Sequence, residues 1–172
     1  MREQQIADVL ARPYAQQLLD GTDPARLAYV GLDGAPRVVP VGFWREGDRV
    51  AIATTPNAPK VAALRADPRV ALTIDTAVFP PKVLLIRGVA ELETVDGVPD
   101  GYVEGSRRFM TAEQFPAWEA GVRALYDRMV VIRVVPTWVK LLDFETTIPQ
   151  AVEELIQAKA GGGISTEDAP DK

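Results

Sequence analysis

The chain has 172 residues, a formal net charge of −5 and hydrophobic residues at 47% of its positions. These values predict a single globular domain with a sizeable core, and the lack of a concentrated basic segment argues against a general nucleic-acid binder. The sequence contains no Cys and no His, which excludes disulfides, thiolate chemistry, cysteine zinc sites, His-containing triads and His-ligated haem. Any redox chemistry is therefore expected to come from a bound organic cofactor.

The sequence also gives expectations about location. No apolar run is long enough to cross a bilayer, and the opening residues MREQQIADVL lack the extended apolar core of a secretory signal. We therefore expect a cytoplasmic protein with no membrane partner.

The hydrophobic pattern predicts short strands joined by turns, with helices capping the ends. Apolar runs between turn residues place strands at 26–32, 37–44, 49–54, 69–75, 82–92, 129–135 and 138–144. Apolar residues at helical spacing place helices at 3–19, 61–66, 111–127 and 148–158, and 93–105 is turn-rich. This order favours a mainly β, antiparallel barrel over a doubly wound parallel sheet. We expect one domain over residues 1–160, followed by a flexible acidic tail over 161–172.

Two prolines fall inside predicted elements. Pro13 is expected to kink or split the first helix, because proline cannot donate the helical hydrogen bond. Pro40 cannot donate to a strand ladder, which predicts that its strand lies at a sheet edge or carries a bulge. An edge leaves backbone groups free to contact a flat ligand.

The bend from Thr54 to Lys60 combines two hydroxyls and a lysine directly before a predicted helix. The first N–H groups of a helix and the positive end of its dipole favour an anion such as phosphate. The spacing is equally typical of a hairpin followed by a helix cap that binds nothing, so the residues alone leave both interpretations open.

Three segments carry a resemblance to a known family: RLAYVGLDGAPRVVPVGFW, IATTPNAPKVAALRADPRVALTID and VLLIRGVAEL. They resemble the split β-barrel flavoproteins related to pyridoxamine 5′-phosphate oxidase, including their deazaflavin-dependent branch. The resemblance implies a six- to seven-stranded antiparallel split β-barrel of the FMN-binding type. It also implies a homodimer with cofactor sites at the subunit interface and a small-molecule substrate.

The resemblance also implies cofactor contacts. The flavin ring would lie against the backbone of Val38, Val39, Pro40 and Val41, and the phosphate would meet Arg37, Thr54, Thr55 and Lys60. The oxidase pattern has an arginine directly before the lysine, where this chain has Pro59. The missing cation would be replaced by Asn57, the N–H of Ala58, Lys82 or Arg87, and Trp138 would come from the partner subunit.

The implied function is an oxidoreductase that passes a hydride or electrons between FMN and a small planar substrate. The deazaflavin coenzyme F-420 is the second candidate cofactor, and its acidic oligoglutamate tail would need further cations, for which Arg45, Arg65 and Arg69 are candidates. The protein could instead be a non-catalytic binding module for a flavin or another planar ligand, or an empty scaffold. Pyridoxamine phosphate oxidation itself is not expected, since the chain has no His and its end, DFETTIPQAVEELIQ, departs from the oxidase pattern.

No catalytic side chain is identified, although Tyr14, Tyr29, Tyr102 and Tyr126 are candidate proton donors.

Overall fold

The computed structural model describes residues 1–161 and shows one antiparallel sheet of seven strands in the order β2-β1-β5-β6-β7-β4-β3. The strands are β1 Ala25–Val30, β2 Pro36–Val41, β3 Trp44–Glu46, β4 Arg49–Thr54, β5 Arg69–Asp75, β6 Val83–Asp96 and β7 Arg128–Leu142. The helices are α1 Glu3–Leu10, α2 Pro13–Asp20, α3 Pro59–Ala66, α4 Asp100–Arg107, α5 Phe115–Leu125 and α6 Gln150–Gly161. The predicted flexible tail lies outside the described residues, apart from Gly161 at the end of α6.

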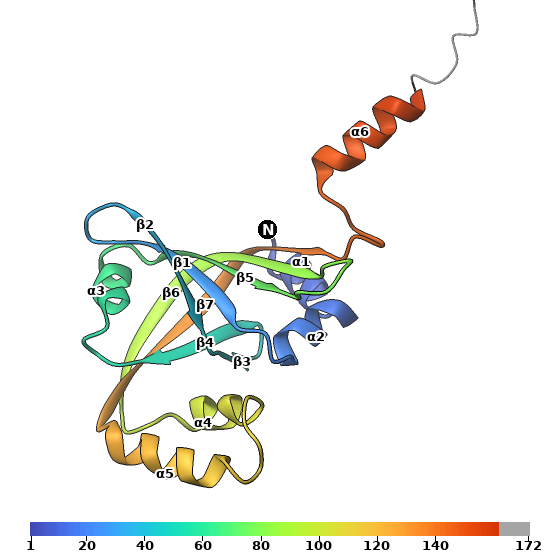
Figure 1. Cartoon of the computed structure of the whole chain (residues 1–172). Coiled ribbons are helices and arrows are strands. Elements are labelled where there is room, and N and C mark those ends of the chain that lie inside the picture. Colours follow the sequence, from blue (N-terminus) through green and yellow to red (C-terminus); the bar gives the residue numbers. More distant parts are fainter. Residues whose placement is uncertain (162–172) are drawn as a thin grey trace, which may run out of the picture.

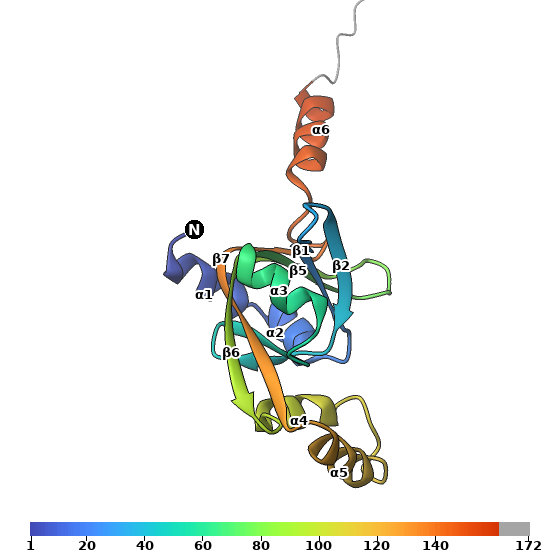
Figure 2. The ribbon, with the colours of Figure 1, turned by 90° about the vertical axis from the view of Figure 1, so that its left-hand side faces the viewer.

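The sheet rolls up without closing, which confirms the predicted mainly β split barrel with capping helices (Figure 1). Its inner face forms one apolar cluster that includes Leu72, Leu84 and Ile132. Helix α3 covers one end of the rolled sheet (Figure 2), and it adds Val61 and Leu64 to this cluster. Helices α1 and α2 add apolar residues to the same cluster. Helix α6 projects away from the body, and its residues 150–160 are exposed.

Both predictions about the prolines are confirmed. Pro13 is the first residue of α2, where a proline is tolerated because the missing N–H has no helical partner. Pro40 lies in β2, which is an edge strand of the sheet. The predicted helix at 61–66 begins two residues earlier, at Pro59, for the same reason as α2.

Three predictions downstream of residue 92 are wrong. Strand β6 continues to Asp96, and α4 occupies 100–107, where the sequence indicates turns. The two predicted strands at 129–135 and 138–144 form the single strand β7. Pro136 does not end this strand, because it lies opposite Gly88 at a bulge that absorbs the extra residue Thr137.

A check for membrane spans gives a negative result for the described residues: none of their helices combines the length and apolarity needed to cross a bilayer.

The bulge predicts a specific stability effect at Gly88. A Cβ atom there would overlap the carbonyl oxygen of Val135, which belongs to the backbone of β7. We expect Gly88→Ala to lower the free energy of unfolding by about 1–3 kcal/mol, as overpacking does elsewhere. Urea unfolding measures the change. The control is Gly121→Ala, in α5 with open space around it, which should stabilise by about 0.5–1 kcal/mol. Equal effects of the two substitutions would contradict this explanation.

Candidate functional site

The opening of the barrel lies between β2 and β4. Strand β3 pairs only with the first half of β4, opposite Arg49, Val50 and Ala51. The second half of β4 has β7 as its only strand neighbour in the described chain. A cavity of about 280 Å³ lies at this opening. Its lining residues come from the end of β2 and the residue after it, from β4, from α3, and from α4 and the segment after it. They are Pro40, Val41, Gly42, Ile52, Ala53, Lys60, Tyr102, Ser106 and Phe109.

Lys60 is the charged group of this cavity. Burial lowers the pKa of its ammonium below the usual value, because taking a charge out of water disfavours the charged form. No acidic partner counteracts this shift within residues 1–161. Lys60 follows Pro59 in the first turn of α3, whose N-cap residue Ala58 contributes no side-chain capping bond. A half-buried cation beside an uncapped helix start fits a phosphate or another anion.

The bend before α3 supplies further polar groups. Thr54 ends β4 and Thr55 follows it, and both are half-buried. Asn57 is exposed, and the N–H of Ala58 donates to the carbonyl of Thr55 at 3.1 Å. The Ala58 N–H is therefore already used within the bend. Of the remaining polar groups, Lys60 lines the cavity, whereas Thr54, Thr55 and Asn57 are its chain neighbours and are not among the lining residues.

Helix α4 forms the wall opposite the β2 end. It packs so closely on β3 that a Cβ atom at Gly101 would overlap the indole of Trp44. Its end is fixed by Arg108, whose guanidinium donates to the carbonyl oxygens of Leu19, at 3.0 Å, and Phe43. The same guanidinium lies 4.5 Å from the centre of the Phe43 ring. These contacts hold α4 in a fixed position over the cavity.

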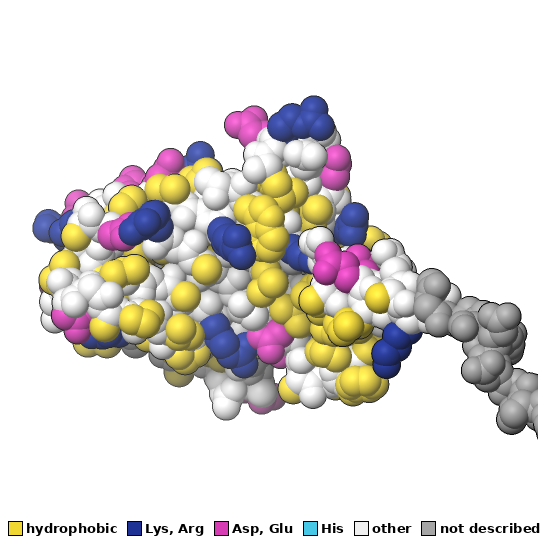
Figure 3. Space-filling view, turned by 90° about the horizontal axis from the view of Figure 1, so that it is seen from above, with side chains coloured by type: hydrophobic (Ala, Val, Ile, Leu, Met, Phe, Trp, Pro, Cys, Tyr) yellow, Lys and Arg dark blue, Asp and Glu magenta, His cyan; other side chains and the backbone are white. Residues whose placement is uncertain are grey.

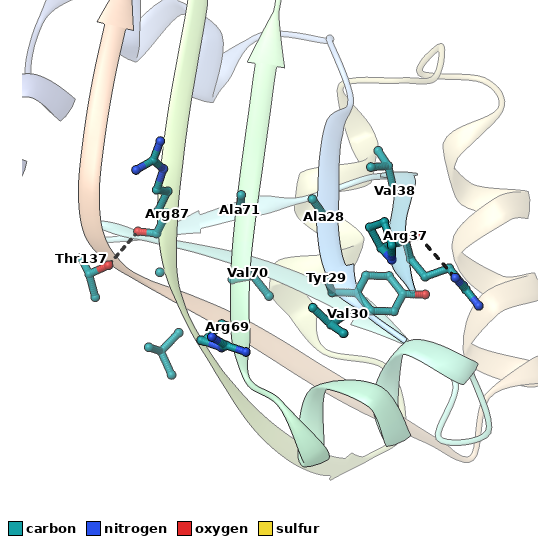
Figure 4. A pocket seen from close by; sticks show the side chains of 13 residues that line it. Ala28, Tyr29, Val30, Arg37, Val38, Arg69, Val70, Ala71, Arg87 and Thr137 are labelled. Carbon is teal, nitrogen blue, oxygen red and sulfur yellow. Dashed lines mark hydrogen bonds between the residues drawn. The ribbon is translucent and has the colours of Figure 1, made fainter. Parts of the chain in front are cut away.

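A second, larger hollow of about 500 Å³ lies on the outer face of the sheet (Figure 4). Its labelled side chains come from β1, β2, β5, β6 and β7, and they include Arg37, Val38 and Arg87. Arg37 is exposed and forms an ion pair with Asp33 at 2.6 Å. The Arg87 guanidinium lies 4.4 Å from the centre of the Trp138 ring.

The structure thus separates the predicted site residues into groups. Pro40, Val41 and Lys60 meet at the barrel opening, and Val39 and Val41 both pack against the core cluster. Val38, Arg87 and Trp138 belong to the outer face. Arg37 borders that hollow too, but it also lines a further hollow with Pro59 and Ala62 of α3, next to the bend. Lys82 precedes β6 and lies over the ring of Tyr14 in α2 at 3.7 Å. Helix α2 lies on the opposite side of the molecule from α3 (Figure 1). Neither Lys82 nor Arg87 is placed beside the bend in this single subunit.

Sequence reasoning missed the wall formed by Tyr102 and Ser106 of α4 and by Phe109, which follows the helix. The available signal was Pro99 followed by Asp100, since a proline and an acid are typical of a helix start. Gly101 and Gly105 argue against a helix in the sequence, because glycine is a poor helix former. In the structure both glycines allow α4 to pack closely on Trp44.

Comparisons with known proteins agree with this architecture. The family described as pyridoxamine 5′-phosphate oxidase matches residues 11–143. An F-420 reductase is similar at 26% identity, over 73% of this chain and 94% of that chain, with a TM-score of 0.56. A conserved hypothetical protein of Mycobacterium tuberculosis is 19% identical over 88% and 94% of the two chains, with a TM-score of 0.56. The general stress protein 26 of Bacillus anthracis is 16% identical over 76% and 92%, with a TM-score of 0.55. No curated protein matches this chain.

The open seven-stranded barrel with a cavity at its split defines a protein of the split-barrel class. Since the family match covers most of the sequence, the chain belongs to the pyridoxamine 5′-phosphate oxidase family.

The attachment of α4 predicts an effect of Arg108→Met. The change leaves the carbonyl oxygens of Leu19 and Phe43 without their donor, which should lower the free energy of unfolding by about 1–3 kcal/mol. Hydrogen exchange should also quicken in α4. The control is Arg128→Met, which removes an exposed 3.3 Å ion pair with Asp96 and should change stability by less than about 0.5 kcal/mol. If Arg108→Met left exchange in α4 unchanged, the guanidinium would not be what holds the helix.

Proposed function

We propose that this protein is a flavin-type oxidoreductase whose cofactor lies at the barrel opening. One observation carries the proposal. Lys60, half-buried and without an acidic partner in the described chain, lines the same cavity as the end of edge strand β2. An anionic tail at Lys60 and a flat ring along Pro40–Gly42 would satisfy both features. The resemblance noted in the sequence supports the same placement.

The residues of the chain have separate roles in this proposal. Lys60 neutralises the phosphate, assisted by the hydroxyls of Thr54 and Thr55. The side chains of Ile52 and Ala53 keep water from one side of the ring. When bound, the cofactor supplies hydride transfer, which the chain's own side chains do not provide.

Of the two cofactors expected from the sequence, we propose the deazaflavin F-420 in preference to FMN. The 26% identity with an F-420 reductase supports this choice. F-420 carries an acidic tail beyond the phosphate, and Arg65 is exposed in the last turn of the same helix as Lys60. FMN needs only the phosphate site and is the second candidate, as the resemblance to FMN-binding proteins favours.

We also propose that the protein is a homodimer joined through the outer face of the sheet. The hollow on this face is lined largely by apolar residues, and Val38 is 64% exposed there. Large exposed apolar patches are uncommon on monomers and mark interaction sites. Seen from above, the surface carries a band of hydrophobic side chains with Lys and Arg beside it (Figure 3). A partner on this face would place Arg87 and Trp138 near a shared cofactor.

The placement of the phosphate predicts the effect of Lys60→Met. Loss of a charge-assisted hydrogen bond should weaken binding of F-420 about ten- to a hundredfold, while the barrel stays folded. Equilibrium titrations with F-420 and with FMN measure both affinities, and the wild-type protein should bind F-420 more tightly.

The matched control is Lys82→Met, which removes a lysine beside Tyr14 and should leave both affinities unchanged. Unaltered binding in Lys60→Met would contradict the phosphate site. Tighter binding of FMN than of F-420 would overturn the choice of cofactor but not the site.

The dimer proposal predicts that Val38→Asp raises the dissociation constant of the dimer about tenfold or more, because it buries a charge in an apolar interface. Sedimentation velocity measures the effect. The control is Val78→Asp, at a residue that is 66% exposed in the loop between β5 and β6, which should not alter association. A wild-type monomer at all concentrations would exclude the proposed dimer.

A further inference from the structure

The wall that α4 presents to the cavity has a distinct chemistry. Among the described residues, no Asp or Glu lines the cavity, so it offers no carboxylate to a cationic ligand. Ser106 donates its hydroxyl hydrogen to the carbonyl of Tyr102 at 2.7 Å, which leaves only its acceptor capacity for a ligand. Phe109 adds an aromatic ring that is 42% exposed.

Tyr102 supplies the hydrogen-bond donor of this wall. Its hydroxyl has no hydrogen-bond partner within the described residues and is not sealed from solvent. The other tyrosines have different surroundings. Tyr14 donates to Glu145 at 2.9 Å, and Tyr29 lines the hollow on the outer face. Tyr126 packs in the same cluster as Tyr102 but is not among the residues that line the cavity. Tyr102 is the tyrosine that shares the cavity with Lys60.

The ring of Tyr102 is held in place. It packs against Trp118 with ring centres 5.8 Å apart, and its helix is pressed onto Trp44 through Gly101. Arg108 fixes the end of the same helix. A donor held by its surroundings loses little entropy when a ligand binds, which is typical of a positioning group.

We propose that α4 forms the substrate side of the site, where the Tyr102 hydroxyl donates a hydrogen bond to the oxygen of a flat, uncharged carbonyl compound and Phe109 covers its ring. The cavity volume of about 280 Å³ lies just below the usual range for ligand sites, which favours a small compound of one or two rings. This inference deepens the proposed function and rests on it, since a carbonyl-bearing ring is a reducible partner for a hydride-transferring cofactor.

The test compares two ligands that differ only in the oxygen: acetonaphthone and ethylnaphthalene, substituted at the same ring position. Tyr102→Phe should weaken binding of acetonaphthone about three- to tenfold and leave ethylnaphthalene unchanged. Phe109→Ala should weaken both compounds alike, because it removes ring contact and no hydrogen bond. Affinities are measured on the protein as purified, by tryptophan fluorescence, with no turnover required.

The control is Tyr14→Phe, which removes a hydroxyl that donates to Glu145 and lies outside the cavity, and it should leave both affinities unchanged. If Tyr102→Phe affected the two compounds equally, or neither, the hydroxyl would not contact the ligand oxygen and the proposal would be overturned. Failure of the wild-type protein to bind either compound would also overturn it. The result is separable from the cofactor test: if Lys60→Met retained its cofactor affinity while Tyr102→Phe discriminated, the proposed cofactor site would fail and the ligand wall would stand.

Discussion

The pairing of β6 with β7 is the constraint on which the rest of the structure depends. The two strands pair from Val83 opposite Leu142 to Asp96 opposite Arg128, with one bulge on the way. One half of the sheet, β5-β1-β2, extends from β6, and the other half, β4-β3, extends from β7. Because each half ends in an edge, rolling of the sheet brings the two edges toward each other without joining them. The cavity at the split is therefore a consequence of how this central pair divides the sheet.

The free-energy cost of burying the Lys60 ammonium explains why we interpret the cavity at the split as an anion-binding site and not as a packing defect. An ammonium removed from water without a partner costs free energy, and the depressed pKa of Lys60 reports that cost. Two arginines of the neighbouring strands differ from Lys60 because each has an acidic partner. Arg37 pairs with Asp33, and Arg133 pairs with Glu46 at 2.6 Å. Lys60 has no acidic partner within residues 1–161, and it lies at a helix start that has no side-chain cap. Binding of an anion would therefore stabilise its charge.

Much of the fold follows from local sequence signals. The turn at Asp33-Gly34 joins β1 to β2, and the strands at 49–54 and 69–75 have the bounds that alternation and turn residues predict. The bend at Thr54–Lys60 is local for the same reason, since its hydroxyls, its lysine and the helix start are neighbours in the chain. Sequence alone can therefore predict a site that lies within one segment, and the assignment of this bend to an anion stays a prediction.

The remainder depends on contacts between distant segments. The continuity of β7 through Pro136 requires Gly88, which lies far away in the sequence and is brought opposite only by the strand register. The position of Tyr102 at the cavity requires α4 to pack on Trp44. No local sequence pattern predicts this contact. Lys82 was a candidate by charge alone, and its contact with Tyr14 became visible only in three dimensions.

A crystal structure of the protein saturated with F-420 tests the central claim most directly. We expect a phosphate oxygen within hydrogen-bond distance of the Lys60 ammonium and a ring seated along Pro40–Gly42, facing Tyr102. Cofactor density elsewhere on the subunit, or a Lys60 side chain turned away toward the protein's own groups, would contradict it.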